Sequence, residues 1–366
     1  MQYKPLIFKV SKLTFLALIS VLLNACSTFD YYSQSVRGQL SVMSKRVPIP
    51  ELIEHKNTSD QKKAMFENIL QIRQFASEHL LLPDNNSYST YVDLEGEYVV
   101  WNVFAAPEFS LTPISSCFLF VGCLQYKGFF AKQDAVDFAA ELRGSNNDVY
   151  VGGVSAYSTL GWFDDPILSS MLTYGEFRLA NVIFHELAHQ LIYIKDDSAF
   201  NEAFATAVGD FGVQQWLQND QREVDLTHLE RNNQWDLAFI NLVLETKEQL
   251  EKLYKSDLNP DQMKNQKQVI FEKLRSDYYA LKTSWDNPPD YDKWMKHDLN
   301  NAKIASVVTY HDLAGSFATL LSLSNNDLSL FYQRVRFLGS LSKEDRHECL
   351  QSLSEDETNQ TRCYNE

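Results

Sequence analysis

Near its middle the chain reads Val182-Ile183-Phe184-His185-Glu186-Leu187-Ala188-His189-Gln190. In a helix, His185 and His189 stand one turn apart on the same face. Two imidazoles at this spacing can bind one Zn²⁺, while Glu186 points beside the metal. The three groups interrupt an apolar segment, 179–194, and burying them there would be costly without a ligand. A solvated polar stripe is the alternative, but the apolar setting favours a metal-binding helix with Glu186 as general base.

A catalytic zinc needs a third protein ligand and an open position. Twelve residues separate His189 from Glu202, which falls in the first turn of a second expected helix, 198–217, that Ser198 is expected to cap. Asp196 and Asp197 are alternative ligands, but a turn holds a carboxylate less rigidly than a helix does. We therefore expect a single Zn²⁺ bound by three side chains, His185, His189 and Glu202.

Several stretches of the chain resemble the predicted zinc aminopeptidase family of bacterial lipoproteins. The likeness fades after about Leu341, and the stretches that carry it are 31–40, 98–108, 117–126, 150–166 and the metal segment 184–206. The resemblance implies a peptidase of the gluzincin kind, in which an HExxH helix is joined by a glutamate ligand, acting on a peptide substrate. The chain departs from better known gluzincins in two ways. The gap before Glu202 is shorter, and Thr206 stands where an aspartate is usual.

The remaining pattern predicts an α+β fold that is mainly helical. Strands are expected over 98–104 and 148–154, with a strand pair in 117–130, so that a small mixed sheet lies beside a zincin-like helix pair at 179–217. Residues 150–157 are expected either to offer an edge to an extended peptide or to form an ordinary buried strand. Helices are expected over 30–45, 61–82, 132–142, 235–253, 261–285, 302–322 and 327–341.

Side chains outside the metal segment are candidates for substrate contact. The aromatic and polar loop 157–166 precedes the metal helix, and Tyr157 in it is expected to line the cleft. Asp164 or Asp165 is expected either to hold the amino terminus of a peptide or to cap the next helix. Zinc peptidases also need a donor for the oxyanion. Tyr310 resembles a recurrent family position, so it is the first candidate and His311 the second.

The first 25 residues have the pattern of a lipoprotein signal peptide. Three lysines precede an apolar run, 13–23, which ends at Leu23-Asn24-Ala25-Cys26. Cys26 is then the lipidated residue. Ser27 rather than aspartate follows it, and the resemblance to lipoproteins of double-membraned bacteria then implies the periplasmic face of the outer membrane of the bacterial envelope. A plain secretory peptide or an uncleaved anchor is the alternative.

The other four cysteines fall in two local pairs, Cys117 with Cys123 and Cys349 with Cys363. Both pairs are expected to be disulfides in an oxidising periplasm, and the second would hold a charged tail, 346–366. The formal charge of −15 makes nucleic acid an unsuitable partner. No Pro/Gly-rich linker divides the chain, which favours one metallopeptidase unit over 26–345 with a helical C-terminal part, 222–341.

Together these features predict a zinc-dependent peptidase, with an aminopeptidase favoured, held at the membrane by a lipid anchor. Two alternatives belong to other classes. One is a metal-assisted hydrolase of cell-wall amide bonds, and the other is a non-catalytic envelope lipoprotein stabilised by zinc. The sequence leaves the oligomeric state open.

Overall fold

The computed structural model describes residues 30–118, 121–285, 291–296, 298–311 and 313–355. The expected signal peptide, Cys26 and Cys363 lie outside these ranges. The fold is α+β and mainly helical, as predicted. Its helices are 30–44, α2 (Ile49–Glu54), α3 (Asp60–Glu78), α4 (Lys132–Gly144), α5 (Glu176–Leu191), α6 (Ser198–Asn219), α7 (Glu223–Tyr254), α8 (Pro260–Thr283), α9 (Asp292–Lys296), α10 (Asn301–His311), α11 (Ala314–Leu323), α12 (Leu328–Ser340) and α13 (Lys343–Glu355).

The strands form three small sheets rather than the single mixed sheet expected. An antiparallel sheet has the order β6 (Lys127–Phe129), β3 (Val100–Pro107) and β7 (Asn147–Val154). The mixed sheet is built from very short strands that the sequence pattern did not predict. These are β1 (Val47–Pro48), β2 (Thr90–Val92) and β8 (Ile167–Leu168). The expected strand pair is the hairpin of β4 (Ser116–Phe118) and β5 (Gly122–Leu124).

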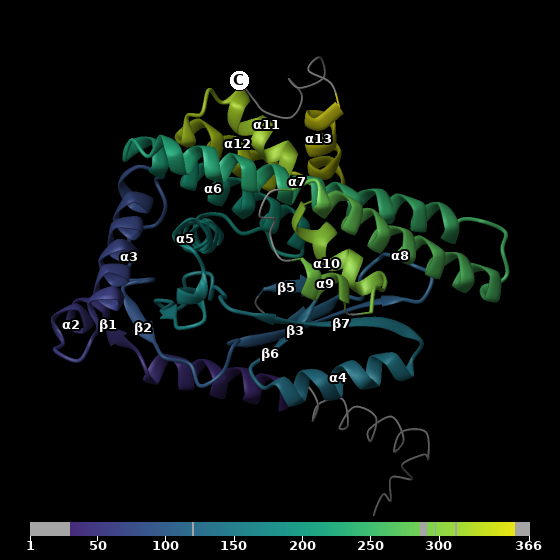
Figure 1. Cartoon of the computed structure of the whole chain (residues 1–366), viewed down its shortest axis with the longest axis horizontal. Helices are drawn as coiled ribbons and strands as arrows, with labels where there is room; N and C mark the ends of the chain where they lie inside the picture. Colours follow the sequence, from purple (N-terminus) through teal and green to yellow (C-terminus); the bar gives the residue numbers. More distant parts are fainter. Residues whose placement is uncertain (1–29, 119–120, 286–290, 297, 312, 356–366) are drawn as a thin grey trace, which may run out of the picture.

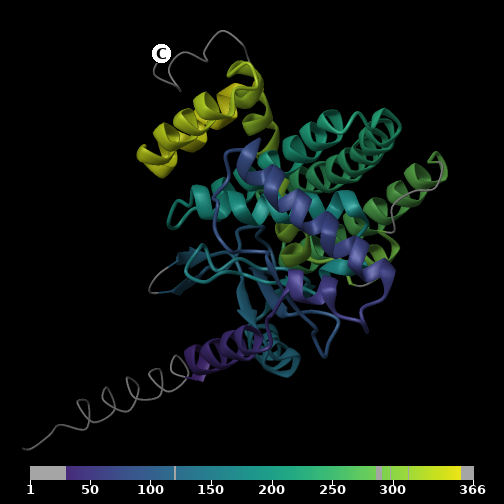
Figure 2. The same ribbon diagram turned by 90° about the vertical axis from the view of Figure 1, so that its left-hand side faces the viewer.

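The antiparallel sheet separates a helical layer from the part of the molecule that carries α5 and α6 (Figure 1). Alternate side chains of β3 point to opposite faces. Val103 and Ala105 pack on one face with Ala135 and Ala139 of α4. The opposite face of β3 looks toward α10 and the α5–α6 pair. Figure 2 shows α11, α12 and α13 at the far side of α6 from the sheet.

The helix pair α5–α6 lies at the centre of the largest hydrophobic core. The buried side chains of α5 include Ile183, Phe184 and Leu187, all fully buried. The two helices approach closely at Gly212, where an added Cβ would lie 2.6 Å from Cδ2 of Phe184. A second core joins α7 and α8 with α9 and α10. Among the described residues no helix has the length and apolar character needed to cross a bilayer.

Several expected boundaries were wrong for identifiable reasons. Helix α7 begins at Glu223, twelve residues before the expected start. Its first turns have little apolar periodicity, and Arg222 at its N-terminus is held to α5 by an ion pair with Glu176. Strand β3 runs on through Pro107, which lies at the strand end where a missing N–H is tolerated.

Two further differences lie in the C-terminal part. The single helix expected over 302–322 forms α10 and α11, with Leu313 buried between them. Residues 346–355, expected in a pinned tail, belong to α13, which packs on α11 and α12.

Candidate metal centre

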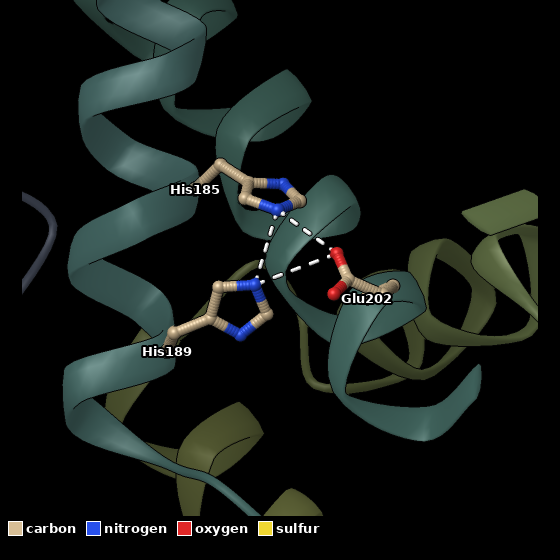
Figure 3. Close-up of side chains that lie close together, drawn as sticks. All are labelled: His185, His189 and Glu202. Carbon is tan, nitrogen blue, oxygen red and sulfur yellow. Dashed lines mark hydrogen bonds and ion pairs between the residues drawn. The ribbon is translucent and has the colours of Figure 1, made fainter. Parts of the chain in front are cut away.

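Helices α5 and α6 bring three side chains that could hold a metal ion to one point (Figure 3). His185 and His189 lie one turn apart on α5, and their Nε2 atoms are 3.1 Å apart. Oε2 of Glu202, in the first turns of α6, lies 3.3 Å from Nε2 of His185 and 3.5 Å from Nε2 of His189. The structure thus brings together the three side chains expected from the sequence.

The spacing and chemistry of these donors fit a zinc ion. Tetrahedral zinc with ligand distances of about 2.0–2.2 Å separates its donor atoms by about 3.3 Å, close to the observed separations of 3.1–3.5 Å. Two neutral imidazoles whose Nε2 atoms meet cannot both carry a proton there, so at least one lone pair faces the shared point. Two imidazoles and one carboxylate are also a donor set that leaves a fourth position open.

The two carboxyl groups beside the histidines have opposite pKa shifts. Burial by itself would raise the pKa of Glu202, which is 8% exposed, but the adjacent histidines lower it to about 2. Glu202 is therefore held as an anion, as a metal ligand must be. Burial raises the pKa of Glu186 to about 7, with an opposing effect of His185. A carboxyl group with a pKa in this range can both accept and return a proton near neutral pH.

The turn between the two helices is fixed by side chains of its own. Asn201 accepts a hydrogen bond from the backbone N–H of Ile194 and donates one to its carbonyl, both at 2.7 Å. The N-cap of α6 is Asp197 rather than the expected Ser198, because the Asp197 carboxylate accepts from the N–H of Phe200. Since Asn201 precedes Glu202, this clamp sets the position of the third ligand.

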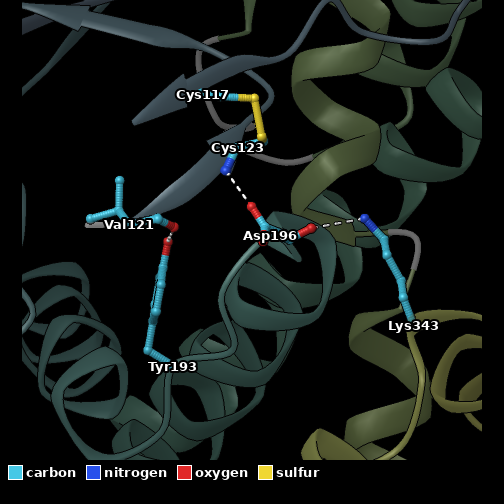
Figure 4. Close-up of a disulfide and its surroundings, with 6 residues drawn as sticks. All are labelled: Cys117, Val121, Cys123, Tyr193, Asp196 and Lys343. Atoms are coloured by element: carbon cyan, nitrogen blue, oxygen red, sulfur yellow. Dashed lines mark hydrogen bonds between the residues drawn. A yellow bond between two sulfur atoms is a disulfide. The ribbon is translucent and has the colours of Figure 1, made fainter. Parts of the chain in front are cut away.

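The two alternative ligands are committed to other contacts. Asp197 is buried, forms an ion pair with Arg346 and is hydrogen-bonded to Nε2 of His347, both in α13. Asp196 accepts a hydrogen bond of 2.7 Å from the N–H of Cys123 (Figure 4). Neither belongs to the set of convergent donors, so the geometry favours Glu202.

The hairpin β4–β5 carries a disulfide between Cys117 and Cys123 and lies on the turn between α5 and α6. Besides its contact with Asp196, it accepts at the Val121 carbonyl a hydrogen bond of 3.1 Å from the hydroxyl of Tyr193. The hairpin is thereby fixed beside the metal-binding side chains.

A cleft of about 2030 Å³ opens above the three donors. It is lined by α5 and α6, by the sheet face that carries Asn102, by Tyr31 and Gln39 of the helix 30–44, and by Trp235 of α7. Small-molecule pockets occupy about 300–1,000 Å³, and this cleft exceeds that range. It has room for several residues of a peptide.

The other predicted site residues have different placements. Tyr157 lines the cleft and donates its hydroxyl proton to Gln39. Asp165 is 1% exposed and accepts from the N–H and hydroxyl of Thr159, so it stabilises the loop from below instead of facing the cleft. Asp164 likewise is not among the lining residues. Tyr310 and His311 end α10, and their side chains lie outside the described part of the structure.

Sequence reasoning missed two cleft residues near the donors. Asp210 lines the cleft and accepts from Asn181 at 2.8 Å. It follows Glu202 by eight residues, so two helical turns on one face were a usable signal. Tyr126 also lines the cleft, and burial together with the charges of Glu202 and Glu186 raises its pKa. No local pattern marks Tyr126, because only the fold brings it near α6.

A family model described as "Putative aminopeptidase" matches residues 30–350, and the chain belongs to this family. The match spans the metal helix pair, the antiparallel sheet and the helices that form the cleft. Membership supports a peptidase. Comparisons with curated proteins and with solved structures gave no match.

Proposed function

We propose that the protein is a zinc-dependent aminopeptidase. The observation that carries this proposal is the convergence of His185, His189 and Glu202 within 4.8 Å of one another, next to Glu186 and under an open cleft. Family membership supplies the peptidase class. The donor set supports the metal, because imidazoles and an anionic glutamate are typical ligands of catalytic zinc.

In this proposal the three ligands hold the ion and Glu186 moves protons. Zinc bound there would lower the pKa of a water molecule and polarise the scissile carbonyl. Glu186 accepts a proton from the nucleophile and returns it to the leaving amine. Its apolar helix environment keeps its proton affinity high enough for both steps, since burial raises its pKa to about 7. The walls of the cleft position the peptide and exclude bulk water.

The proposal also includes the place of action. An acyl-modified Cys26 would hold the protein at the periplasmic face of the outer membrane, and only a few residues separate Cys26 from the helix 30–44. Multiple acyl chains give stable attachment. The intact mass of the native protein tests this point, because a species that retains residues 1–25 would contradict it.

The experiment for the catalytic proposal compares three purified proteins: the wild type, Glu186→Gln, and Glu78→Gln as a control for an exposed glutamate. Each is assayed for zinc content and for cleavage of a mixed peptide library by mass spectrometry. Glu186→Gln should retain zinc and lose at least 10²-fold in cleavage, the lower end of general-base effects. Full activity in Glu186→Gln would contradict the assigned mechanism. If the wild type cleaved murein fragments but no peptides, the substrate would be a cell-wall amide and not a peptide.

A further inference from the structure

One rung of the antiparallel sheet, meaning a row of directly paired residues across its three strands, has an unusual composition. Asn102 of β3 is directly paired with Gly128 of β6 on one side and with Gly152 of β7 on the other. Directly paired residues project their side chains to the same face of a sheet. Across all three strands, therefore, the Asn102 amide is the one side chain on this rung.

This amide faces the cleft. Its neighbour Val103 points the other way, into the layer formed with α4, whereas Asn102 and Gly128 are cleft-lining residues. On this rung the carboxamide and Gly128 form part of the floor of the cleft, whereas Gly152 is not among the residues that line it.

The carboxamide is buried without a protein partner. Asn102 is only 7% exposed, yet among the described residues its side chain forms no hydrogen bond. Two other buried asparagines behave differently: Asn201 holds Ile194, and Asn301 donates to three backbone carbonyls. Its Oδ1 and Nδ2 are not among the fully buried polar atoms that lack a partner, so the amide is reached from the cleft, and a ligand there can satisfy its donor and acceptor.

The two glycines provide space and not backbone freedom. Neither has a positive φ, so extended backbone at these positions would accept any residue. A Cβ at Gly128, however, would lie 3.0 Å from Oδ1 of Asn102, and a Cβ at Gly152 would lie 3.2 Å from the ring of Tyr150. The Tyr150 ring therefore occupies the space above Gly152, whereas the lack of a side chain at Gly128 leaves Oδ1 of Asn102 uncovered on that side.

The part of the cleft floor that carries Asn102 lies along the sheet from the candidate metal centre. Phe104 is two residues further along β3, about 7 Å at the usual rise of a strand. Its ring packs on that of Tyr126 at 5.3 Å between centroids, and Tyr126 lies in the electrostatic field of Glu202 and Glu186. Asn102 thus lines the same cleft as the three candidate ligands, on the strand that leads to the contact with Tyr126.

We propose that Asn102 binds a backbone peptide group of the substrate, donating from Nδ2 to its carbonyl oxygen and accepting at Oδ1 from its N–H. The inference rests on the proposed function and deepens it. A carboxamide has one donor group and one acceptor, matching a secondary amide, and Gly128 beside it leaves the amide uncovered without adding a side chain of its own. Recognition at this subsite is thus independent of the substrate side chain and requires a peptide N–H.

The test measures binding without turnover. Zinc-loaded Glu186→Gln and the double variants Glu186→Gln/Asn102→Leu and Glu186→Gln/Val103→Ala are equilibrated with a mixed hexapeptide library. The same library is also supplied with a single N-methyl group at each bond in turn. Val103→Ala disturbs the same strand from the opposite face and reports any effect of lost stability. Bound peptides are quantified by mass spectrometry.

Asn102→Leu should weaken binding of the unmethylated library about tenfold, as expected for loss of one or two net hydrogen bonds. Methylation at one position should weaken peptide binding by the parent protein, Glu186→Gln, by a similar factor. It should not weaken binding further in the variant that also carries Asn102→Leu, since the same contact cannot be lost twice. Val103→Ala should keep the parent's N-methyl profile. If Asn102→Leu does not fold, Asn102→Asp, which lacks the donor, gives the same comparison.

Unchanged binding by Asn102→Leu, or equal sensitivity of both proteins to every N-methyl position, would overturn the role of Asn102 while leaving a peptidase that cleaves peptides intact. Absence of peptide binding by Glu186→Gln together with absence of cleavage by the wild type would instead overturn the proposed function, and the Asn102 inference with it. Cleavage by the wild type thus separates the two failures.

Discussion

Asp197 links the metal helix pair to the last helix, and its replacement by alanine should destabilise the protein strongly. Its side chain is fully buried and caps α6 through the N–H of Phe200. The same carboxylate lies 2.9 Å from Nε of Arg346, without hydrogen-bond geometry, and 2.9 Å from Nε2 of His347. Arg346 is itself only 6% exposed, so the ion pair is shielded from water.

The magnitude follows from these contacts. Loss of an Asp cap costs about 1 kcal/mol. Removal of one partner from a buried ion pair costs about 3–5 kcal/mol, because the other charge stays buried. The two effects share one carboxylate and do not simply add. We expect Asp197→Ala to lower the free energy of unfolding by about 4 kcal/mol.

A matched control is available in Asp327, which caps α12 by accepting from the N–H of Leu330 in an exposed setting. Asp327→Ala should cost about 1 kcal/mol. Urea unfolding of the zinc-loaded proteins, followed by circular dichroism, compares the two variants. If Asp197→Ala were no more destabilising than Asp327→Ala, the buried ion pair would contribute nothing and the reasoning would be refuted.

Three further outcomes are expected. On the acid side kcat/KM should fall with a midpoint at or below about pH 7, because the proton acceptor is ionised Glu186 and a bound cation can only lower its pKa of about 7; an acid-side midpoint well above pH 7 would contradict this. Burial raises the pKa of Asp165 to about 6, so ionisation opposes folding. Relative to the wild type, Asp165→Asn should therefore gain up to about 3 kcal/mol in unfolding free energy as pH rises from 4 to 7; parallel pH profiles would argue against it. Replacing both Cys117 and Cys123 by serine should cost about 2 kcal/mol on the chain-entropy account and leave the zinc content unchanged, as unfolding and metal analysis can check.

The helix pair α5–α6 and the convergence of its three side chains could be predicted because the signal is local. Two histidines at helical spacing interrupt an apolar run, and Glu202 follows at the start of the next helix. The cap of that helix could not be settled locally. Asp197 and Ser198 are both good capping residues. Asp197 is the cap in the structure, and its carboxylate also contacts Arg346 and His347, which lie far along the chain.

The opposite wall of the cleft was beyond local reasoning. Asn102 precedes the ligands by more than eighty residues, and its meaning depends on the register that sets Gly128 and Gly152 beside it. A strand pattern predicts that β3 exists but not which residues pair with it. The mixed sheet was missed for a related reason, since β1 and β8 have two residues each and carry no periodicity.

The central claim is that His185, His189 and Glu202 bind one zinc ion. X-ray absorption at the zinc edge of the purified protein, with zinc content per chain, measures this directly. We expect one zinc per chain with about two imidazoles and only nitrogen or oxygen ligands, at about 2.0–2.2 Å, and loss of this spectrum in Glu202→Ala. A chain without zinc, a sulfur ligand, or an unchanged spectrum in Glu202→Ala would contradict the assignment.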